Sequence, residues 1–259
     1  MVEVKNLSFS YGERPVLSDI SFRAEEGELL SVLGSNGVGK STLFRCMLGL
    51  LPGYSGQVLI AGQDIENLSA RKLARLAAYI PQTSSPAFNY SVEDIVLMGC
   101  SSELGVFSSP GRAELARVDW ALEKIGIAGL KKRCFHHLSG GERQLVIIAR
   151  ALAQNARVLM LDEPTASLDF GNQMLILSQI KALAAEGYTV IQTTHNPEQS
   201  YMFSDRILAI KDGRVLAQGS PRQVISQETL SLLYGADIRL SSLFGDRVRV
   251  CTPAFLADK

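Results

Sequence analysis

The chain has 259 residues, with 26 Lys and Arg against 26 Asp and Glu, so its formal net charge is zero. This length suffices for one large domain or for a core with a subdomain, and the neutral balance argues against a broad nucleic-acid-binding surface. Four widely spaced cysteines lack metal-ligand spacing, which predicts free cytosolic thiols at Cys46, Cys100, Cys134 and Cys251.

Neither secretion nor membrane insertion is indicated. Residues 1–6 contain no basic segment followed by an apolar core, so we expect no secretory signal. The apolar run at 145–149 stops at Arg150, and no run in the sequence reaches the length of a membrane span. We therefore expect a chain that does not itself cross a membrane.

The first 33 residues predict short strands at 7–11, 16–22 and 29–33, separated by turns. Tyr11 stands before Gly12, where a strand gives way to a turn. Its ring is either an ordinary strand-end aromatic or a platform for a nucleobase, a contact worth about 1–3 kcal/mol.

Residues 34–42 follow the buried strand 29–33 and precede a helix predicted over 43–48. The spacing Gly-x4-Gly-Lys-Ser between a strand and a helix is that of a phosphate-binding loop. Its backbone N–H groups and the helix N-terminus bind anions, the lysine carries a point charge for the β- and γ-phosphates, and the serine hydroxyl can ligate Mg²⁺. The predicted nucleotide ligands are Gly34, Ser35, Asn36, Gly37, Val38, Gly39, Lys40, Ser41 and Thr42.

A strand is expected at 57–60, a helix at 69–78, and a further strand that ends at Pro81 and Gln82. Gln82 is either a solvated polar residue or, beside a phosphate loop, a ligand for Mg²⁺ or water that moves when nucleotide binds. Between 83 and 137 we expect an inserted, mostly helical subdomain. Its clearest helix carries an apolar stripe closed by Gly126, and Trp120 is expected in the core.

A second anion-binding turn precedes the long helix that ends near residue 153. Ser139, Gly140 and Gly141 begin that helix with exposed N–H donors, a hydroxyl and the positive end of its dipole. Taken alone, this turn is an ordinary helix cap. Its position after a phosphate loop makes it a candidate nucleotide ligand.

Two carboxylates follow the buried strand at 157–161. Asp162 can hold Mg²⁺ through water, and Glu163 can polarise an attacking water, since such a strand end opens into the ligand crevice of an α/β sheet. A turn at 167–169 ends in Asp169, ahead of a helix at 172–186. The next strand, 188–194, delivers His195 to the same sheet edge, where it is either structural or in contact with a γ-phosphate. An Asp-Gly hairpin then joins strands 206–210 and 215–218, and residues 221–259 carry no identifiable chemistry.

These motifs, in this order, resemble those of ABC-type ATPases over residues 1–220. The resemblance implies an α/β fold: a P-loop NTPase core (1–82 and 138–220) with an antiparallel β subdomain, a helical subdomain (83–137) and a C-terminal extension (221–259). It implies ATP and Mg²⁺ as cofactors and a head-to-tail homodimer with two ATPs at its interface. Tyr11 and Asp169 would join the nucleotide ligands, Ser41, Gln82 and Asp162 would hold the metal, and Glu163, His195 and Gln82 would be catalytic.

Residues 88–99 and 11–17 resemble more closely the ATPase subunits of importers for ferric siderophores, haem and vitamin B12. Three positions depart from that pattern: Ser35, Cys100 and Ser167 stand where proline, arginine and histidine are common. None of these departures removes a phosphate or metal ligand. The resemblance implies a peripheral subunit on the cytoplasmic face of the inner membrane, docked on an integral, dimeric membrane permease and linked indirectly to a substrate-binding protein.

Two functions other than transport are compatible with an ATPase of this kind. A soluble ABC ATPase could remodel a scaffold, as in iron–sulfur cluster assembly. DNA maintenance is disfavoured because no long heptad insertion separates the two anion-binding turns and the net charge is neutral, so no nucleic-acid partner is expected. For transport, residues 83–110 are the predicted permease dock, with apolar candidates Phe88, Tyr90, Val92, Leu97, Met98, Val106 and Phe107, and Leu104 as a further test position.

Overall fold

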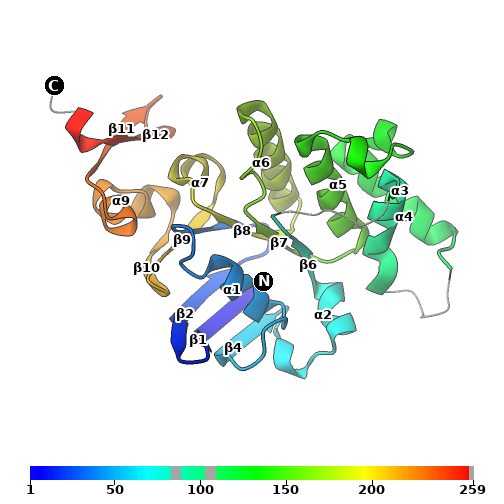
Figure 1. The fold of residues 1–259 in the computed structure, drawn as a ribbon, viewed down its shortest axis with the longest axis horizontal. Coiled ribbons are helices and arrows are strands. Elements are labelled where there is room, and N and C mark those ends of the chain that lie inside the picture. Colours follow the sequence, from blue (N-terminus) through cyan, green and yellow to red (C-terminus); the bar gives the residue numbers. More distant parts are fainter. Residues whose placement is uncertain (83–88, 103–108, 257–259) are drawn as a thin grey trace.

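The computed structural model describes residues 1–82, 89–102 and 109–256. A six-stranded sheet runs through the middle of the molecule, with a smaller sheet on one side of it and helices on the other (Figure 1). The strands are β1 (Val2–Tyr11), β2 (Arg14–Ala24), β3 (Leu29–Leu33), β4 (Ser55–Ile60), β5 (Gln63–Asp64), β6 (Ala77–Ile80), β7 (Val158–Asp162), β8 (Thr189–Thr194), β9 (Arg206–Lys211), β10 (Arg214–Gly219), β11 (Ile238–Leu243) and β12 (Val248–Pro253).

Helices connect most of these strands. The α-helices are α1 (Lys40–Met47), α2 (Ala70–Leu76), α3 (Val92–Leu97), α4 (Arg112–Ile125), α5 (Gly140–Ala153), α6 (Phe170–Ala185), α7 (Pro197–Phe203), α8 (Pro221–Val224) and α9 (Gln227–Tyr234). Single 3-10 turns are η1 (Ile65–Asn67), η2 (Met98–Ser102), η3 (Ala128–Leu130), η4 (Phe135–His137) and η5 (Ala254–Leu256).

The central sheet has the strand order β10-β9-β3-β8-β7-β6 and is parallel except for β10. Every residue of β3, β7 and β8 is buried, as expected for parallel strands covered on both faces. Because these three strands run in the same direction, their carboxyl ends meet at one edge. The segments that begin at Gly34, Glu163 and His195 therefore lie side by side.

Helix α1 lies between the central sheet and the four-stranded sheet, whose order is β2-β1-β4-β5. Its buried side chains Leu43, Phe44 and Met47 join one core with residues of both sheets. The small sheet is antiparallel. This is the predicted antiparallel β part of the fold.

Helices α5 and α6 pack on the opposite face of the central sheet. In the described part of the chain, α3 and α4 pack chiefly against α5 and against each other. The stripe predicted on α4 is confirmed at Val118, Ala121, Leu122 and Ile125, which are all buried, but it is wrong at Leu115, which is 39% exposed. The expectation for Trp120 is wrong: its side chain is 44% exposed, because position 120 falls between the turns of that stripe and faces outward.

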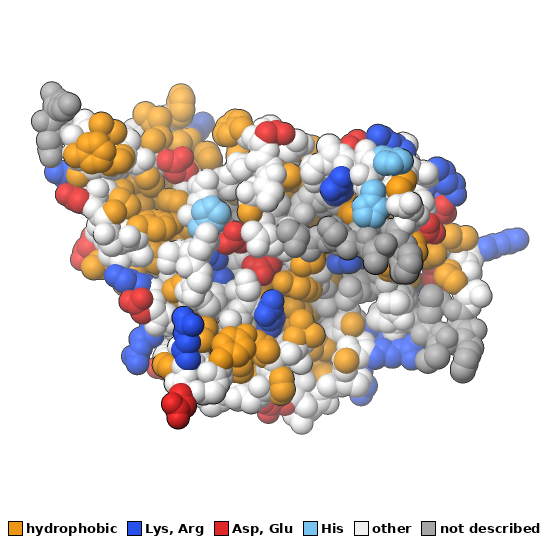
Figure 2. Space-filling model, in the orientation of Figure 1, with side chains coloured by type: hydrophobic (Ala, Val, Ile, Leu, Met, Phe, Trp, Pro, Cys, Tyr) orange, Lys and Arg blue, Asp and Glu red, His pale blue; other side chains and the backbone are white. Residues whose placement is uncertain are grey.

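The Asp-Gly hairpin between β9 and β10 is confirmed. Asp212 and Gly213 both have positive φ, at 49° and 71°, which is the backbone of the two-residue turn that matches strand twist. Beyond it, α8, α9, β11, β12 and η5 form the C-terminal segment, residues 221–256, at one end of the molecule (Figure 1). Hydrophobic side chains gather over that end (Figure 2). Within this segment Phe244 and Phe255 are exposed.

Several element boundaries differ from the sequence expectation. Helix α1 begins three residues early, at Lys40, because the phosphate loop itself starts the helix. Helix α6 begins at Phe170, since the Asp169 side chain accepts the N–H of Asn172 and caps it. The helix expected over 69–78 ends at Leu76, where β6 begins.

All four cysteines are free, with Cys46 and Cys100 buried. Within the described parts of the chain, no helix combines the length and apolarity needed to cross a membrane.

Candidate functional site

The phosphate loop joins β3 to α1 in the geometry that its glycines require. Gly37 and Gly39 have φ of 80° and 111°, in the region that favours glycine. A Cβ on Gly34 would lie 2.8 Å from the carbonyl oxygen of Ile210, and one on Gly39 would lie 2.9 Å from Leu17 Cδ2. The loop is therefore a compact curl of backbone at the N-terminus of a helix, as anion binding needs.

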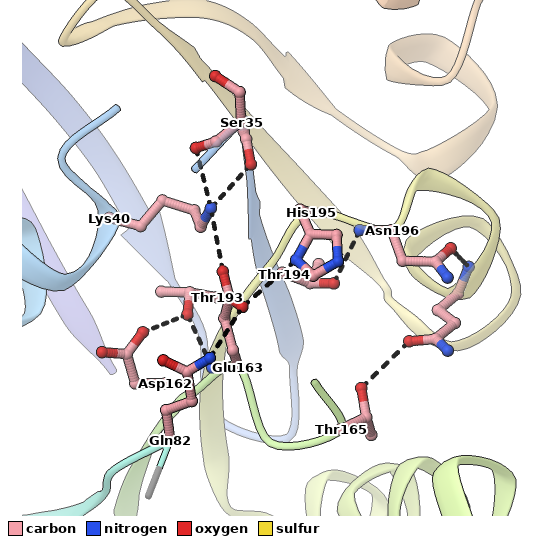
Figure 3. Close-up of polar contacts among 12 residues, drawn as sticks. Ser35, Lys40, Gln82, Asp162, Glu163, Thr165, Thr193, Thr194, His195 and Asn196 are labelled. Carbon is pink, nitrogen blue, oxygen red and sulfur yellow. Dashed lines mark hydrogen bonds and ion pairs between the residues drawn. The ribbon is translucent and has the colours of Figure 1, made fainter. Parts of the chain in front are cut away.

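Lys40 is buried and folds back over this loop (Figure 3). Its Nζ donates to the carbonyl oxygens of Gly34 at 2.8 Å and Ser35 at 3.1 Å, and lies 3.3 Å from Glu163 Oε1. The ammonium group is thus held at the mouth of the loop, where an incoming phosphate would compete with the Glu163 carboxylate for it.

Glu163 is the point where the segments converge (Figure 3). Its Oε2 lies 3.3 Å from Nδ1 of His195 and 3.4 Å from Nε2 of Gln82. Its φ is 46°, an uncommon backbone for glutamate, and its N–H donates to Thr193 Oγ1 at 2.9 Å. Unusual backbone of this kind is concentrated at functional sites, where the surrounding structure holds it in place.

Asp162 is buried next to Glu163 and both of its carboxylate oxygens accept hydrogen bonds. Thr193 Oγ1 donates to Oδ1 at 2.6 Å, and the Tyr79 hydroxyl donates to Oδ2 at 3.2 Å. Burial, with the Asp162 charge, raises the pKa of Tyr79 to about 12, so the phenol remains a donor at neutral pH. An Asp162 carboxylate fixed in this way fits a ligand that reaches it through a water molecule.

A cavity of about 600 Å³ opens beside the loop, and half of the predicted nucleotide-binding, metal and catalytic residues line it. Tyr11 stands at its edge, 46% exposed, with its ring packed edge-to-face on Phe9 at 4.9 Å between centroids. Among the described residues, the lining is formed by Tyr11, Arg14, Val16, Asn36, Gly37, Gly39, Lys40, Ser41, Thr42, Gln82 and Glu163.

The turn at Ser139 lies elsewhere, since none of its residues is among the described lining of that cavity. Ser139 caps α5: its Oγ accepts from the N–H of Glu142, while Glu142 Oε2 accepts from the N–H of Ser139. Gly140 and Gly141 pack against the segment that starts α6, where a Cβ on Gly141 would lie 2.3 Å from Asn172 Oδ1.

Asp169 belongs to that second group. Hydrogen bonds from Asn172, first from its backbone N–H and then from its side chain, hold the pKa of Asp169 below its usual range. The structure thus divides the predicted nucleotide ligands into two clusters: the cavity beside the phosphate loop, and the paired N-termini of α5 and α6.

Sequence reasoning missed several residues of the first cluster. Thr193 bonds to both Asp162 and Glu163, Tyr79 holds Asp162, and Arg14 and Val16 line the cavity. Next to this edge, the Thr165 hydroxyl donates to the side-chain oxygen of Gln199, and the Gln199 amide donates to that of Gln173. The one available signal was the polar pair Thr193 and Thr194 at the end of an apolar strand.

The predicted permease dock falls partly outside the described residues, which exclude Phe88, Leu104, Val106 and Phe107. Of the candidates that are described, Val92 is buried in the core and Leu97 packs against it, whereas Met98 is 41% exposed.

A phosphate loop between a parallel strand and a helix, with strand-end carboxylates beside it, defines a P-loop nucleotide-binding protein. A family model described as "ABC transporter" matches residues 17–166, more than half of the chain. The chain belongs to the ABC transporter family, and its fold class, a P-loop ABC ATPase core with an antiparallel sheet and added helices, is confirmed.

Relatives extend this likeness over most of the chain. An ABC transporter ATP-binding protein of Haemophilus influenzae is 39% identical over 90% of this chain and 89% of its own length. A probable iron chelatin transport ATP-binding protein of Helicobacter pylori is 37% identical, covering 95% of this chain and 96% of its own. A hemin import ATP-binding protein of Rhizobium meliloti is 34% identical, with 93% and 94% covered.

Among solved structures, an inward-facing putative metal-chelate type ABC transporter matches with a TM-score of 0.86 and 32% identity, covering 98% of each chain. The ATP-binding members of this family bind and hydrolyse ATP, and this chain is such an ATPase. Those that serve importers are membrane-associated and work with membrane permease components.

Proposed function

We propose that this chain powers import of a metal chelate, a ferric siderophore, haem or cobalamin, through a separate membrane permease. One observation carries the substrate class: the likeness to a metal-chelate type transporter spans 98% of both chains, so it includes the C-terminal segment as well as the ATPase motifs. The chain would sit on the cytoplasmic face of the plasma membrane, with a substrate-binding protein reached only through the permease.

In this proposal ATP occupies the cavity beside the phosphate loop. The ring of Tyr11 stacks on adenine, the loop N–H groups bind the phosphates, and Lys40 moves from Glu163 to the β- and γ-phosphates. The fit rests on the inward-curled glycine backbone, the cavity volume of about 600 Å³ and a buried ammonium at its floor.

Ser41, Asp162 and Gln82 are the proposed holders of Mg²⁺. Their hydroxyl, carboxylate and amide oxygens are the donor types that this ion takes, and Ser41 and Gln82 line the same cavity. When bound, the ion would neutralise charge that develops on the transferred phosphoryl group.

Glu163 is the proposed general base. Released from Lys40, its carboxylate would orient and deprotonate the attacking water, with His195 and Gln82 as the neighbours that report the presence of the γ-phosphate. We propose that residues 83–137 form a subdomain that rotates against the core of 1–82 and 138–220 as Gln82 follows the nucleotide.

The second anion-binding cluster leads to the proposed homodimer. Ser139, Gly140 and Gly141 would reach the ATP held by the phosphate loop of the other subunit, together with Asp169. A ligand shifts a two-state equilibrium only by its differential affinity, so the γ-phosphate must contact both subunits in the closed state. ATP then closes the dimer and hydrolysis opens it.

Reconstitution with the permease tests the proposal. Proteoliposomes that contain the full transporter should take up one of the radiolabelled chelates, ferric siderophore, haem or cobalamin, in an ATP-dependent way. Lys40→Ala is the matched control and should abolish both uptake and hydrolysis. The alternative, a soluble ATPase that remodels a cytosolic scaffold, predicts hydrolysis without any hydrophobic partner in detergent-solubilised membranes. ATP hydrolysis without a hydrophobic partner, together with no uptake of any of the three chelates, would contradict import and favour the soluble ATPase.

A further inference from the structure

The C-terminal segment, residues 221–256, reaches the sheet edge that carries the predicted catalytic residues through Tyr234. Tyr234, the last residue of α9, donates its hydroxyl to the backbone carbonyl oxygen of His195 at 2.8 Å. The helix ends there because Gly235 takes φ of 65°. Burial raises the pKa of the Tyr234 phenol, so the hydroxyl remains protonated and keeps its proton for this bond.

This bond completes the restraint of a single peptide unit. The carbonyl of His195 and the N–H of Asn196 belong to the same peptide plane, and that N–H donates to Thr194 Oγ1 at 3.0 Å. With both of its polar groups bonded, the plane between β8 and α7 is fixed. The preceding plane is held as well, since the N–H of Gly34 donates to the Thr194 carbonyl oxygen at 3.3 Å, and the two planes together set the direction of the Cα–Cβ bond of His195.

The imidazole needs such a restraint because its side chain is half exposed. Among the described residues its side-chain partner is the mostly buried Glu163, at 3.3 Å between Nδ1 and Oε2, and a single contact leaves the orientation of a half-exposed ring weakly restrained. The backbone therefore decides where the ring points, and Tyr234 is the part of that restraint that comes from outside the ATPase motifs.

The rest of the segment holds the helix that follows His195. The N–H of Cys251 donates to Glu198 Oε1 at 2.9 Å, and the guanidinium of Arg249 lies 4.8 Å from the centroid of the Tyr201 ring. The Tyr201 hydroxyl donates to the carbonyl oxygen of Asp246 at 2.8 Å. Strand β12 and the turn before it therefore contact α7, while α9 holds His195, two residues before that helix begins.

We propose that Tyr234 is a positioning residue for ATP hydrolysis, through which the C-terminal segment sets the orientation of His195 towards Glu163. This rests on the role proposed above for His195. It assigns to residues 221–256 a function in the catalytic step rather than in nucleotide affinity.

Tyr234→Phe tests this, because it removes the hydroxyl and keeps the ring. We expect kcat for ATP to fall about three- to tenfold while KM stays within about twofold, since an interaction that orients a catalytic neighbour acts on the chemical step. Tyr201→Phe is the matched control: it removes a hydroxyl that also donates to a backbone carbonyl at 2.8 Å in the same region, but does not touch His195. It should leave kcat unchanged.

A spectroscopic readout separates this inference from the proposed function. The chain has three histidines, so selective ¹⁵N labelling gives resolved imidazole resonances. Tyr234→Phe should move the His195 signals and leave those of His136 and His137 in place, whether or not the isolated chain hydrolyses ATP. Replacing Tyr234 by p-aminophenylalanine, which retains a donor, should restore both the signals and kcat.

Unmoved His195 signals in Tyr234→Phe would overturn the inference, as would an equal loss of kcat in Tyr201→Phe, which would indicate general loosening of the segment. If Tyr234→Phe does not fold, the p-aminophenylalanine variant tests the inference through its His195 signals. Its His195 signals should match the wild type, and a mismatch in a folded protein counts against the inference.

Discussion

At the scale of single residues, the site depends on the strained position of Glu163. Its backbone is held by Thr193, and its carboxylate is shared between Lys40 on one oxygen and His195 and Gln82 on the other. Glu163 thus links the phosphate-loop lysine to the histidine that follows β8. A change of charge at this one side chain should therefore separate nucleotide binding from hydrolysis.

Glu163→Gln should retain ATP binding and slow hydrolysis by about 10²–10⁴, the scale of a lost general base. The amide keeps the shape of the side chain and its contact with Gln82, but it cannot accept a proton from water. Equilibrium binding of a fluorescent ATP analogue and single-turnover hydrolysis measure the two effects. Turnover at the wild-type rate would remove Glu163 from this role.

At Tyr11 the contribution of the ring to nucleotide binding can be separated from that of the hydroxyl. The ring is half exposed at the edge of the cavity and packs against Phe9. Tyr11→Ala should weaken nucleotide binding by about 1–3 kcal/mol, the usual value of one base-stacking contact. Tyr11→Phe and Tyr11→Trp should be nearly silent, since stacking needs only a π face. Titration calorimetry with ATP distinguishes these cases, and a Phe variant as weak as Ala would assign the effect to the hydroxyl instead.

At the scale of elements, the N-termini of α5 and α6 are built as a pair. Ser139 caps one helix and Asp169 the other, and Gly141 of the first fits directly against Asn172 of the second. Asn172 cannot move away freely, because its Nδ2 donates to Asp169 Oδ2 at 2.7 Å. Packing therefore demands the glycine, whatever it contributes to anion binding.

Gly141→Ala should lower the free energy of unfolding by about 1–3 kcal/mol, as overpacking does. The new Cβ must displace Asn172 or push the two helices apart. Gly129→Ala is the control, because a Cβ there meets no heavy atom within 4 Å, and it should change stability by less than about 0.5 kcal/mol. Urea titrations of both variants give the comparison. If both variants had the same free energy of unfolding, Asn172 would be able to move away from the new methyl group without loss of stability.

At the scale of the whole molecule, the two anion-binding clusters are not combined within one chain. The described cavity contains the phosphate loop, Tyr11 and Glu163, whereas the Ser139 turn packs beside α6. The Ser139 turn is a predicted anion-binding turn that is not among the described lining of its own chain's cavity, which is consistent with the proposed head-to-tail dimer, in which each ATP lies between two chains.

Heterodimers carrying Lys40→Ala on one chain and Ser139→Arg on the other test that arrangement. Each homodimer should be inactive, the first through loss of charge on the phosphates and the second through a bulky cation facing the nucleotide. The tethered heterodimer carries both defects in one site and none in the other, so it should regain about half of the wild-type rate if the sites act independently.

Ser139→Ala controls for the helix cap, since it should cost about 0.5–2 kcal/mol of stability without placing a cation in the site. Thermal melts of all variants separate folding from activity. If a folded Ser139→Arg homodimer hydrolyses ATP at the wild-type rate, the proposal that two chains share each ATP site is wrong.

The sequence by itself determined the features that depend on neighbouring residues. The phosphate loop, the Asp-Gly hairpin and the buried strands that lead to Asp162 and His195 were predictable, because local backbone chemistry and apolar runs dictate them. The antiparallel β subdomain was expected only from the resemblance to ABC-type ATPases. Half of the predicted site residues line the cavity, because parallel strands bring their carboxyl ends to one edge of the sheet.

Only the tertiary structure decided which distant residues meet at that edge. Thr193 bonds the Asp162 carboxylate and the Glu163 backbone N–H because the register of β7 and β8 sets it opposite Asp162. Tyr79 reaches Asp162 from β6, Gly141 fits against Asn172, and Tyr234 reaches His195 from the far end of the chain. The two residues of each pair lie 30 to 83 positions apart in the sequence. They meet because of strand register or helix packing, neither of which can be inferred from the local sequence.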